Sequence, residues 1–191
     1  MSETSFKRYD QSDGGDWSII QRAATQYESG LSHRVLKSLR VLSEESQGHP
    51  VDRLEHSLQT ATRAFRSHAS EEMTVCALLH DIGDDLSPCN HGPLAAAILR
   101  PYVNDDLAWL VEHHEIFQGY FFFHHIGRDR NEREKFRGHP AFELTADFCE
   151  KWDQTSFERG YDTMPLEAFE PMVHRLFARE PVIQTAARVA K

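Results

Sequence analysis

Apolar side chains recur every three to four residues along most of this chain, and this helical spacing limits the possible folds more than any other feature. In the segment 51–66, Leu54, Leu58, Ala61 and Phe65 are spaced by four, three and four residues, which draws one apolar stripe along a helix. Alternating patterns typical of half-buried strands are almost absent, so we expect an all-α fold. The periodic segments predict helices over Trp17–Tyr27, His33–Leu42, Val51–Arg66, Glu71–Leu79, Pro93–Tyr102, Asp105–His114, Phe142–Trp152 and Leu166–Ala178.

Capping residues support several of these helix boundaries. Ser70, Asn90 and Asn104 are residue types that accept hydrogen bonds from the first backbone amides of a helix, so we expect them as N-caps. Pro93 suits the first turn of a helix, and Gly83 can end the helix that precedes it.

The length of 191 residues is typical of one domain. The loops 47–50 and 128–140 are polar and rich in Gly, Pro and charged residues, but neither is long enough to separate two domains. We expect a single domain over residues 1–191, with the N-terminal and C-terminal helices packed on its core.

Net charge and cysteine content exclude several classes of partner and site. The 21 Lys and Arg residues and 30 Asp and Glu residues give a net charge of −9, which argues against a nucleic-acid partner. The first ten residues lack the apolar core of a signal peptide, and no apolar run approaches the roughly 20 residues needed to cross a bilayer. The three cysteines show no C-x-x-C spacing, so neither a disulfide framework nor a thiolate zinc site is indicated. The sequence predicts a cytoplasmic protein with no membrane partner and leaves its oligomeric state open.

Histidine and aspartate residues at helix ends are the candidates for chemistry. His80 and Asp81 follow an apolar helix, and a carboxylate buried there must be paired, hydrogen-bonded or metal-bound. Alternatively, Asp81 begins the acidic stretch that includes Asp84 and Asp85, and is solvated. His56 projects away from the apolar stripe of its own helix, where an isolated histidine is usually exposed.

Further candidate ligands occur near other helix ends. His91 follows a predicted N-cap, Asp153 follows Trp152, and His113 and His114 end a predicted helix, where a histidine is also favourable for electrostatic reasons alone. Imidazole and carboxylate groups together suit Fe, Mn, Zn or Ni.

The order of these residues resembles the HD-domain metalloprotein superfamily, whose pattern is H…HD…D. The resemblance runs from about Val51 to Gln154 and implies a single HD-type helical bundle around a dinuclear metal site. It implies that one metal is held by His56, His80, Asp81 and Asp153. It also implies that His91 and His114 hold the second metal and that Asp81 bridges the two; the choice of His114 over His113 rests on the family's spacing from Val111.

Within that superfamily, the segment 53–59 is similar to the mixed-valent diiron oxygenases that cleave the carbon–phosphorus bond of 1-hydroxyalkylphosphonates. His139-Pro140 and Trp152-Asp153 resemble the same branch. The resemblance implies two iron ions, Fe(II) and Fe(III), with Mn or another divalent metal as the alternative, and His80 and Asp81 as catalytic residues. It also implies dioxygen and a small organophosphonate as partners, the substrate being a 1-hydroxy-2-aminoethylphosphonate or its N-trimethyl form.

Several positions depart from that branch. Gln118 stands where the amine-substrate enzymes carry a lysine, and Glu150 stands where they carry an arginine. Ser46 and His49 correspond roughly to a tyrosine and a glutamate that close the site. The metal ligands therefore carry over better than the substrate pocket.

An aromatic run over residues 117–123 follows the last predicted histidine ligand. Aromatic faces attract quaternary ammonium groups, which favours the N-trimethyl substrate, although we expect three of the five rings to fill the core. Arg128, Arg130 or Arg133 can hold an anionic group, or be solvated. The predicted substrate-binding residues are Gln118, Tyr120, His124, His125, Arg128, Glu150 and His49.

Two other functions are compatible with the sequence. A metal-dependent phosphohydrolase acting on a small phosphate ester or nucleotide can use the same ligands, with metal-bound hydroxide as the nucleophile. A catalytically silent sensor module is the third interpretation, and six intact metal ligands argue against it.

Overall fold

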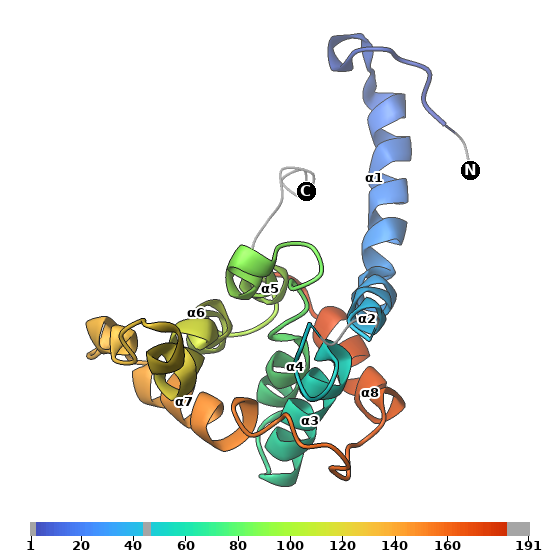
Figure 1. The fold of residues 1–191 in the computed structure, drawn as a ribbon. Helices are drawn as coiled ribbons and strands as arrows, with labels where there is room; N and C mark the ends of the chain where they lie inside the picture. The colour runs from blue at the N-terminus through green and yellow to red at the C-terminus, as the bar shows by residue number, and fades with distance from the viewer. Residues whose placement is uncertain (1–2, 44–46, 183–191) are drawn as a thin grey trace.

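The computed structural model describes residues 3–43 and 47–182, and within these ranges the chain is all-α with no strand. The fold class is therefore as predicted. Figure 1 shows a long N-terminal helix that extends away from a bundle formed by the other helices. The α-helices are α1 (Gly14–Ser29), α2 (Leu31–Val41), α3 (Arg53–Arg66), α4 (Glu71–Leu79), α5 (His91–Leu99), α6 (Asp105–Phe122), α7 (Phe142–Phe148) and α8 (Leu166–Phe177). Short helical turns are η1 (Tyr9–Gln11), η2 (Pro88–Asn90), η3 (Phe123–Ile126), η4 (Glu132–Phe136) and η5 (Cys149–Asp153).

Most helix boundaries lie close to the prediction, and two of the three predicted side-chain caps form. Ser70 accepts a hydrogen bond from the Met73 amide at the start of α4, and Asn104 accepts one from the Leu107 amide at the start of α6. Asn90 precedes α5, but its side chain accepts no capping hydrogen bond.

Helix α6 runs eight residues past its predicted end at His114, because the aromatic run continues the helix instead of starting a loop. Gly119 does not interrupt it. The ring of Phe123 lies against Gly119, and a Cβ atom at that position would come within 2.3 Å of the ring.

The predicted role of Gly83 as a helix end is wrong, because α4 already ends at Leu79. Gly83 instead allows a close contact with the start of α5. A Cβ atom at Gly83 would lie 2.6 Å from the backbone carbonyl oxygen of His91. The glycine therefore fixes how closely the turn after α4 approaches α5.

The single apolar stripe predicted for α3 is only partly correct. Leu58 and Ala61 are buried, but the Phe65 residue is 41% exposed. His56 is buried instead of solvated, and polar residues that share its side of the helix, Gln59 and Thr60, are also fully buried. Helix α3 is enclosed on more than one side because it packs against both α4 and η5.

The core lies between α2, α3, α4, α5, α6, α7 and α8. Helix α8 packs on α2 and α4 through apolar residues such as Phe169, Val173 and Leu176, which are at most 1% exposed. Helix α1 contains no buried residue and contacts α2 at its C-terminal end (Figure 1). Among the described residues, no helix combines the length and apolar character needed to cross a bilayer.

Candidate metal centre

Six side chains from five parts of the chain converge at the centre of the bundle. His56 comes from α3, His80 and Asp81 from the turn after α4, and His91 from the first residue of α5. His114 comes from α6 and Asp153 from the end of η5, and all six residues are buried. These are the six residues that the sequence pattern names as metal ligands.

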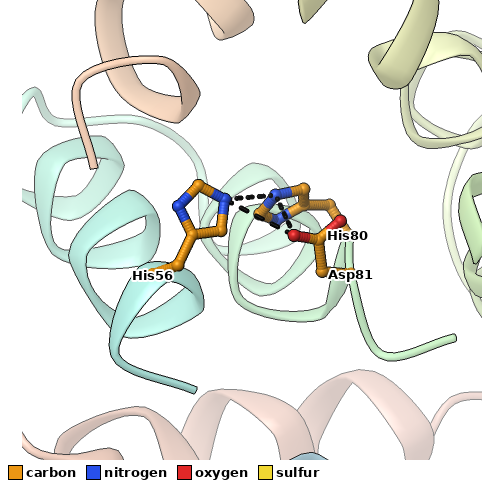
Figure 2. A group of neighbouring side chains, drawn as sticks. All are labelled: His56, His80 and Asp81. Atoms are coloured by element: carbon orange, nitrogen blue, oxygen red, sulfur yellow. Dashed lines mark hydrogen bonds and ion pairs between the residues drawn. The ribbon is translucent and has the colours of Figure 1, made fainter. Parts of the chain in front are cut away.

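His56, His80 and Asp81 form one side of this cluster, and Figure 2 shows the two imidazole rings facing the carboxylate. The Nε2 atoms of His56 and His80 lie 3.2 Å apart. Each of these Nε2 atoms is 3.4 Å from Oδ2 of Asp81. The three groups can surround one cation.

Asp153 completes this side of the cluster. Its Oδ1 atom is 3.1 Å from Nε2 of His56 and 3.7 Å from Nε2 of His80. The same oxygen accepts a hydrogen bond of 2.9 Å from the Gln118 amide nitrogen. Oδ2 of Asp153 is buried and has no hydrogen-bond partner in the described parts of the chain. A buried anionic oxygen without a donor is costly unless a cation neutralises it.

His91 and His114 form the other side of the cluster. Their Nε2 atoms are 3.3 Å apart, and they lie 3.3 Å and 3.2 Å from Oδ1 of Asp81. Asp81 therefore directs one oxygen toward each pair of histidines. This is the arrangement expected of a carboxylate that bridges two metal ions.

Backbone carbonyl oxygens orient all four histidine rings through their Nδ1 atoms. The Nδ1 atoms of His56, His80, His91 and His114 lie 2.7–3.2 Å from backbone carbonyl oxygens, at Ser156, Ala77, Pro88 and Val111 respectively. A carbonyl oxygen only accepts hydrogen bonds, so each Nδ1 donates its proton to the backbone and leaves Nε2 as the ring nitrogen that faces the cluster.

The cluster thus brings four imidazole Nε2 atoms and two carboxylates together. Such a set of nitrogen and oxygen atoms can bind cations, and backbone carbonyls that orient ligating imidazoles are a usual feature of metal sites. Nitrogen and oxygen donors of this kind suit iron, manganese or zinc. The residues present therefore fit a metal centre.

Arg53 and Asp84 extend the cluster on the Asp81 side. The Arg53 guanidinium pairs with Oδ2 of Asp81, and its Nε atom donates to Asp84 at 3.1 Å. Asp84 is itself buried, and it also accepts a hydrogen bond of 3.2 Å from Gln47. Asp84 in turn holds Arg53 against the shared carboxylate.

These neighbours set the ionisation of the two aspartates. Burial alone raises the pKa of Asp81, but the positive field of His80 and Arg53 outweighs it and holds that pKa well below its usual range. Burial likewise acts to raise the pKa of Asp153, and its contacts with His56 and His80 lower it instead. Both carboxylates are therefore ionised and available as ligands.

The predicted substrate-binding residues do not all lie in one place. Gln118 reaches the cluster through its bond to Asp153, and its own carbonyl oxygen Oε1 is buried without a hydrogen-bond partner among the described residues. His49 is exposed, but its ring stacks on Phe157, which stacks on His56 at a centroid distance of 4.4 Å. The remaining predicted positions lie at or near the surface: Tyr120 is half-buried, and His124, His125, Arg128 and Glu150 are exposed.

His113 turns away from the cluster. Its ring stacks on Trp109 at 4.2 Å, and its Nδ1 atom donates to the Trp109 carbonyl oxygen. Its neighbour His114 is the one directed at Asp81. Of the five aromatic rings in the run 117–123, Phe117 and Phe123 are buried and Phe121 packs against the core from a half-buried position.

Sequence analysis did not identify Arg53, Asp84 or Phe157 as individual site residues. Arg53 lies three positions before His56, and Asp84 lies three positions after Asp81. This spacing of about one helical turn from a candidate ligand is the only indication in the sequence that they belong to the site. Their pairing across 31 residues becomes visible only in the fold.

Comparison with known proteins gives one result that bears on the family. No curated protein sequence matches the chain. The HD domain matches residues 53–168, which include all six residues of the cluster and more than half of the chain. The chain therefore belongs to the HD-domain family.

Proposed function

We propose that the protein is a dinuclear metal-dependent enzyme, and that the two oxygens of Asp81 bridge its metals. The observation that carries this proposal is the division of four Nε2 atoms into two pairs, each facing a different oxygen of Asp81. His56, His80 and Asp153 would hold one metal, and His91 and His114 the other. When bound, a pair of redox-active irons would bind an oxyanion substrate and activate dioxygen.

The reaction that we propose is oxidative cleavage of the carbon–phosphorus bond of a 1-hydroxy-2-aminoethylphosphonate or its N-trimethyl form. The substrate carbon is oxidised to a carboxylic acid, and its phosphorus leaves as inorganic phosphate. One dioxygen molecule accepts four electrons, and its two oxygen atoms enter the products. The support for this reaction is the likeness of the segment 53–59 to the diiron oxygenases, together with the clustered ligand set.

The chain contributes position and charge to this reaction. Arg53, which is also paired with Asp84, fixes the orientation of the Asp81 carboxylate that would bridge the two metals. Gln118 fixes Asp153 in the same way. Phe157 covers the ring of His56 and limits the access of water from that side.

The position of Tyr120 argues against one part of the expected substrate pocket. The guanidinium groups of Arg130 and Arg133 already lie over its ring, at 4.2 Å and 3.7 Å from the centroid. A ring whose face is taken by two cations does not also attract a substrate ammonium. Any preference for the N-trimethyl substrate therefore depends on other rings, of which Phe157 lies nearest to His56.

The experiment that tests this function follows phosphate and dioxygen together. Iron-loaded, partly oxidised protein is incubated with the free-amine and the N-trimethyl phosphonates, with and without dioxygen. We expect one dioxygen consumed for each phosphate released, and no phosphate without dioxygen. Equal phosphate release in the absence of dioxygen overturns the oxygenase proposal.

A metal-dependent phosphohydrolase is the second candidate. Two positions favour it: Gln118 replaces an expected lysine and is engaged with Asp153, and Glu150, which replaces an expected arginine, is exposed on η5. Dioxygen-independent hydrolysis of a small phosphate ester by the metal-loaded protein is the result that selects this candidate.

A further inference from the structure

Two arginines share one tyrosine ring beside the C-terminal end of α6. Tyr120 lies in the last turns of that helix, Arg133 belongs to η4, and Arg130 precedes η4. Because both guanidinium carbons lie within 4.2 Å of the same ring centroid, the two positive charges are held near each other.

These two guanidinium groups lack the oxygen partners that the other stacked arginines have. Arg130 makes no ion pair within residues 3–43 and 47–182, and its Nε atom is buried without a hydrogen-bond partner there. The Nε atom of Arg133 is also buried without a hydrogen-bond partner among the described residues. Its nearest carboxylate, that of Glu134, is 3.8 Å away and is already paired with Arg137.

The other arginines that stack on aromatic rings each also contact an oxygen atom. Stacking on a ring therefore does not by itself explain why Arg130 and Arg133 lack such a partner. The contacts are Arg34 with the carbonyl of Tyr27, Arg63 with Glu158, Arg66 with Asp162, Arg128 with Glu132, and Arg137 with Glu134.

The carboxylates near these two arginines in the sequence, Asp129, Glu132 and Glu134, already have other partners. The rings of His124 and His125 lie 3.9 Å apart, and desolvation, His125 and Arg130 together lower the pKa of His124. The neighbouring carboxylate of Glu132 is taken by Arg128. In a chain with a net charge of −9, a pair of arginines without a carboxylate between them is unusual.

We propose that Arg130 and Arg133, held in place by Tyr120, form a binding site for an oxyanion of the phosphate class. The Tyr120 ring packs against both guanidinium groups, and their terminal nitrogens, which are not among the buried atoms without a partner, can donate to a ligand. A planar guanidinium fork matches the spacing of phosphate oxygens, and two forks supply enough charge for a dianion. The site involves none of the six residues of the metal centre, so this proposal does not rest on the proposed function.

The test is a calorimetric titration of the metal-loaded full-length chain with inorganic phosphate. The variants are R130Q and R133Q, with R133K to separate charge from fork geometry and R34Q as the matched control. Arg34 also stacks on a ring, but it donates to the Tyr27 carbonyl oxygen. Circular dichroism checks that each variant retains its helices. The same titration in D81N removes any contribution of phosphate bound at the metal centre.

We expect R130Q and R133Q each to weaken phosphate binding at least tenfold, R133K to weaken it less, and R34Q to leave it within twofold. The D81N chain should retain this phosphate site. The proposal is overturned if wild-type and D81N chains bind no phosphate at millimolar concentration, or if R130Q and R133Q bind it as tightly as the wild type does. Binding of an acidic peptide but not of phosphate would also overturn it.

Discussion

The Nε2 atoms of His56 and His80 lie 3.2 Å apart, and both lie 3.4 Å from Oδ2 of Asp81. Both rings donate their Nδ1 protons to backbone carbonyls. Nε2 is therefore the nitrogen that each ring can offer to a metal, and one cation bound by both nitrogens would also contact Asp81.

Replacing Arg53 should destabilise the metal-free protein strongly. The R53M variant leaves Asp81 and Asp84 buried without their shared cation, which should lower the free energy of unfolding by about 3 kcal/mol. The matched control is R66M, on the same helix, whose exposed pair with Asp162 should contribute little to stability. Urea unfolding with and without metal measures both. Bound metal should reduce the difference in unfolding free energy between R53M and the wild type. Equal losses of unfolding free energy in R53M and R66M would contradict the role of Arg53.

Removing the Gln118 amide should weaken one metal site more than the other. In Q118L, Asp153 loses the donor that fixes its Oδ1 atom, and the loss of such an outer contact typically costs 10-fold or more in metal affinity. Q21L, an identical change at an exposed position of α1, serves as the control. Metal titration by calorimetry checks the prediction, and unchanged affinity in Q118L would show that Asp153 does not depend on this bond.

The contact at Gly83 should not tolerate a methyl group. In G83A, the added Cβ atom meets the His91 carbonyl at 2.6 Å, so either the turn or the start of α5 must shift, at a cost of about 1–3 kcal/mol. G14A, where nothing lies within 4 Å, should change stability by less than about 1 kcal/mol. Chemical unfolding compares the two. If G83A is as stable as G14A, the close approach is not tight in solution.

Acid should destabilise the metal-free protein through Asp81 and Asp153. Both have a folded-state pKa below the unfolded value of about 3.9, so their contribution is fully present above that value and is lost as the pH falls toward the folded pKa. Stability should therefore decline below about pH 5. In D153N the slope should be smaller by up to about 1.4 kcal/mol per pH unit, while D85N, at an exposed position, keeps the wild-type slope. Unfolding curves at several pH values test this, and identical slopes would contradict it.

The sequence predicts the helices and the order of the cluster residues well, because both depend on local patterns. Helix α4 has the predicted bounds, and Ser70 and Asn104 cap as expected. Burial of His56 was not predictable from its own helix, since it arises from contact with η5, which lies about 90 residues further along the chain.

The turn that presents Asp153 was also beyond the reach of sequence patterns. The segment 142–152 predicts one continuous helix, but its last turn is a π-helix, closed by a hydrogen bond from the Gln154 amide to the Cys149 carbonyl. Five residues are too few to distinguish a π period from an α period. The wider turn changes the direction in which Asp153 projects, and such turns occur often at functional sites.

The most direct test of the account is the location of metal in crystals of iron-loaded protein by anomalous scattering at the iron edge. We predict two iron positions in each chain, one among His56, His80 and Asp153 and the other between His91 and His114, with Asp81 in contact with both. The D81N protein should lose iron from both positions under the same loading conditions. A single iron position in the fully loaded wild type, or two positions of which only one touches Asp81, would contradict the bridged dinuclear centre.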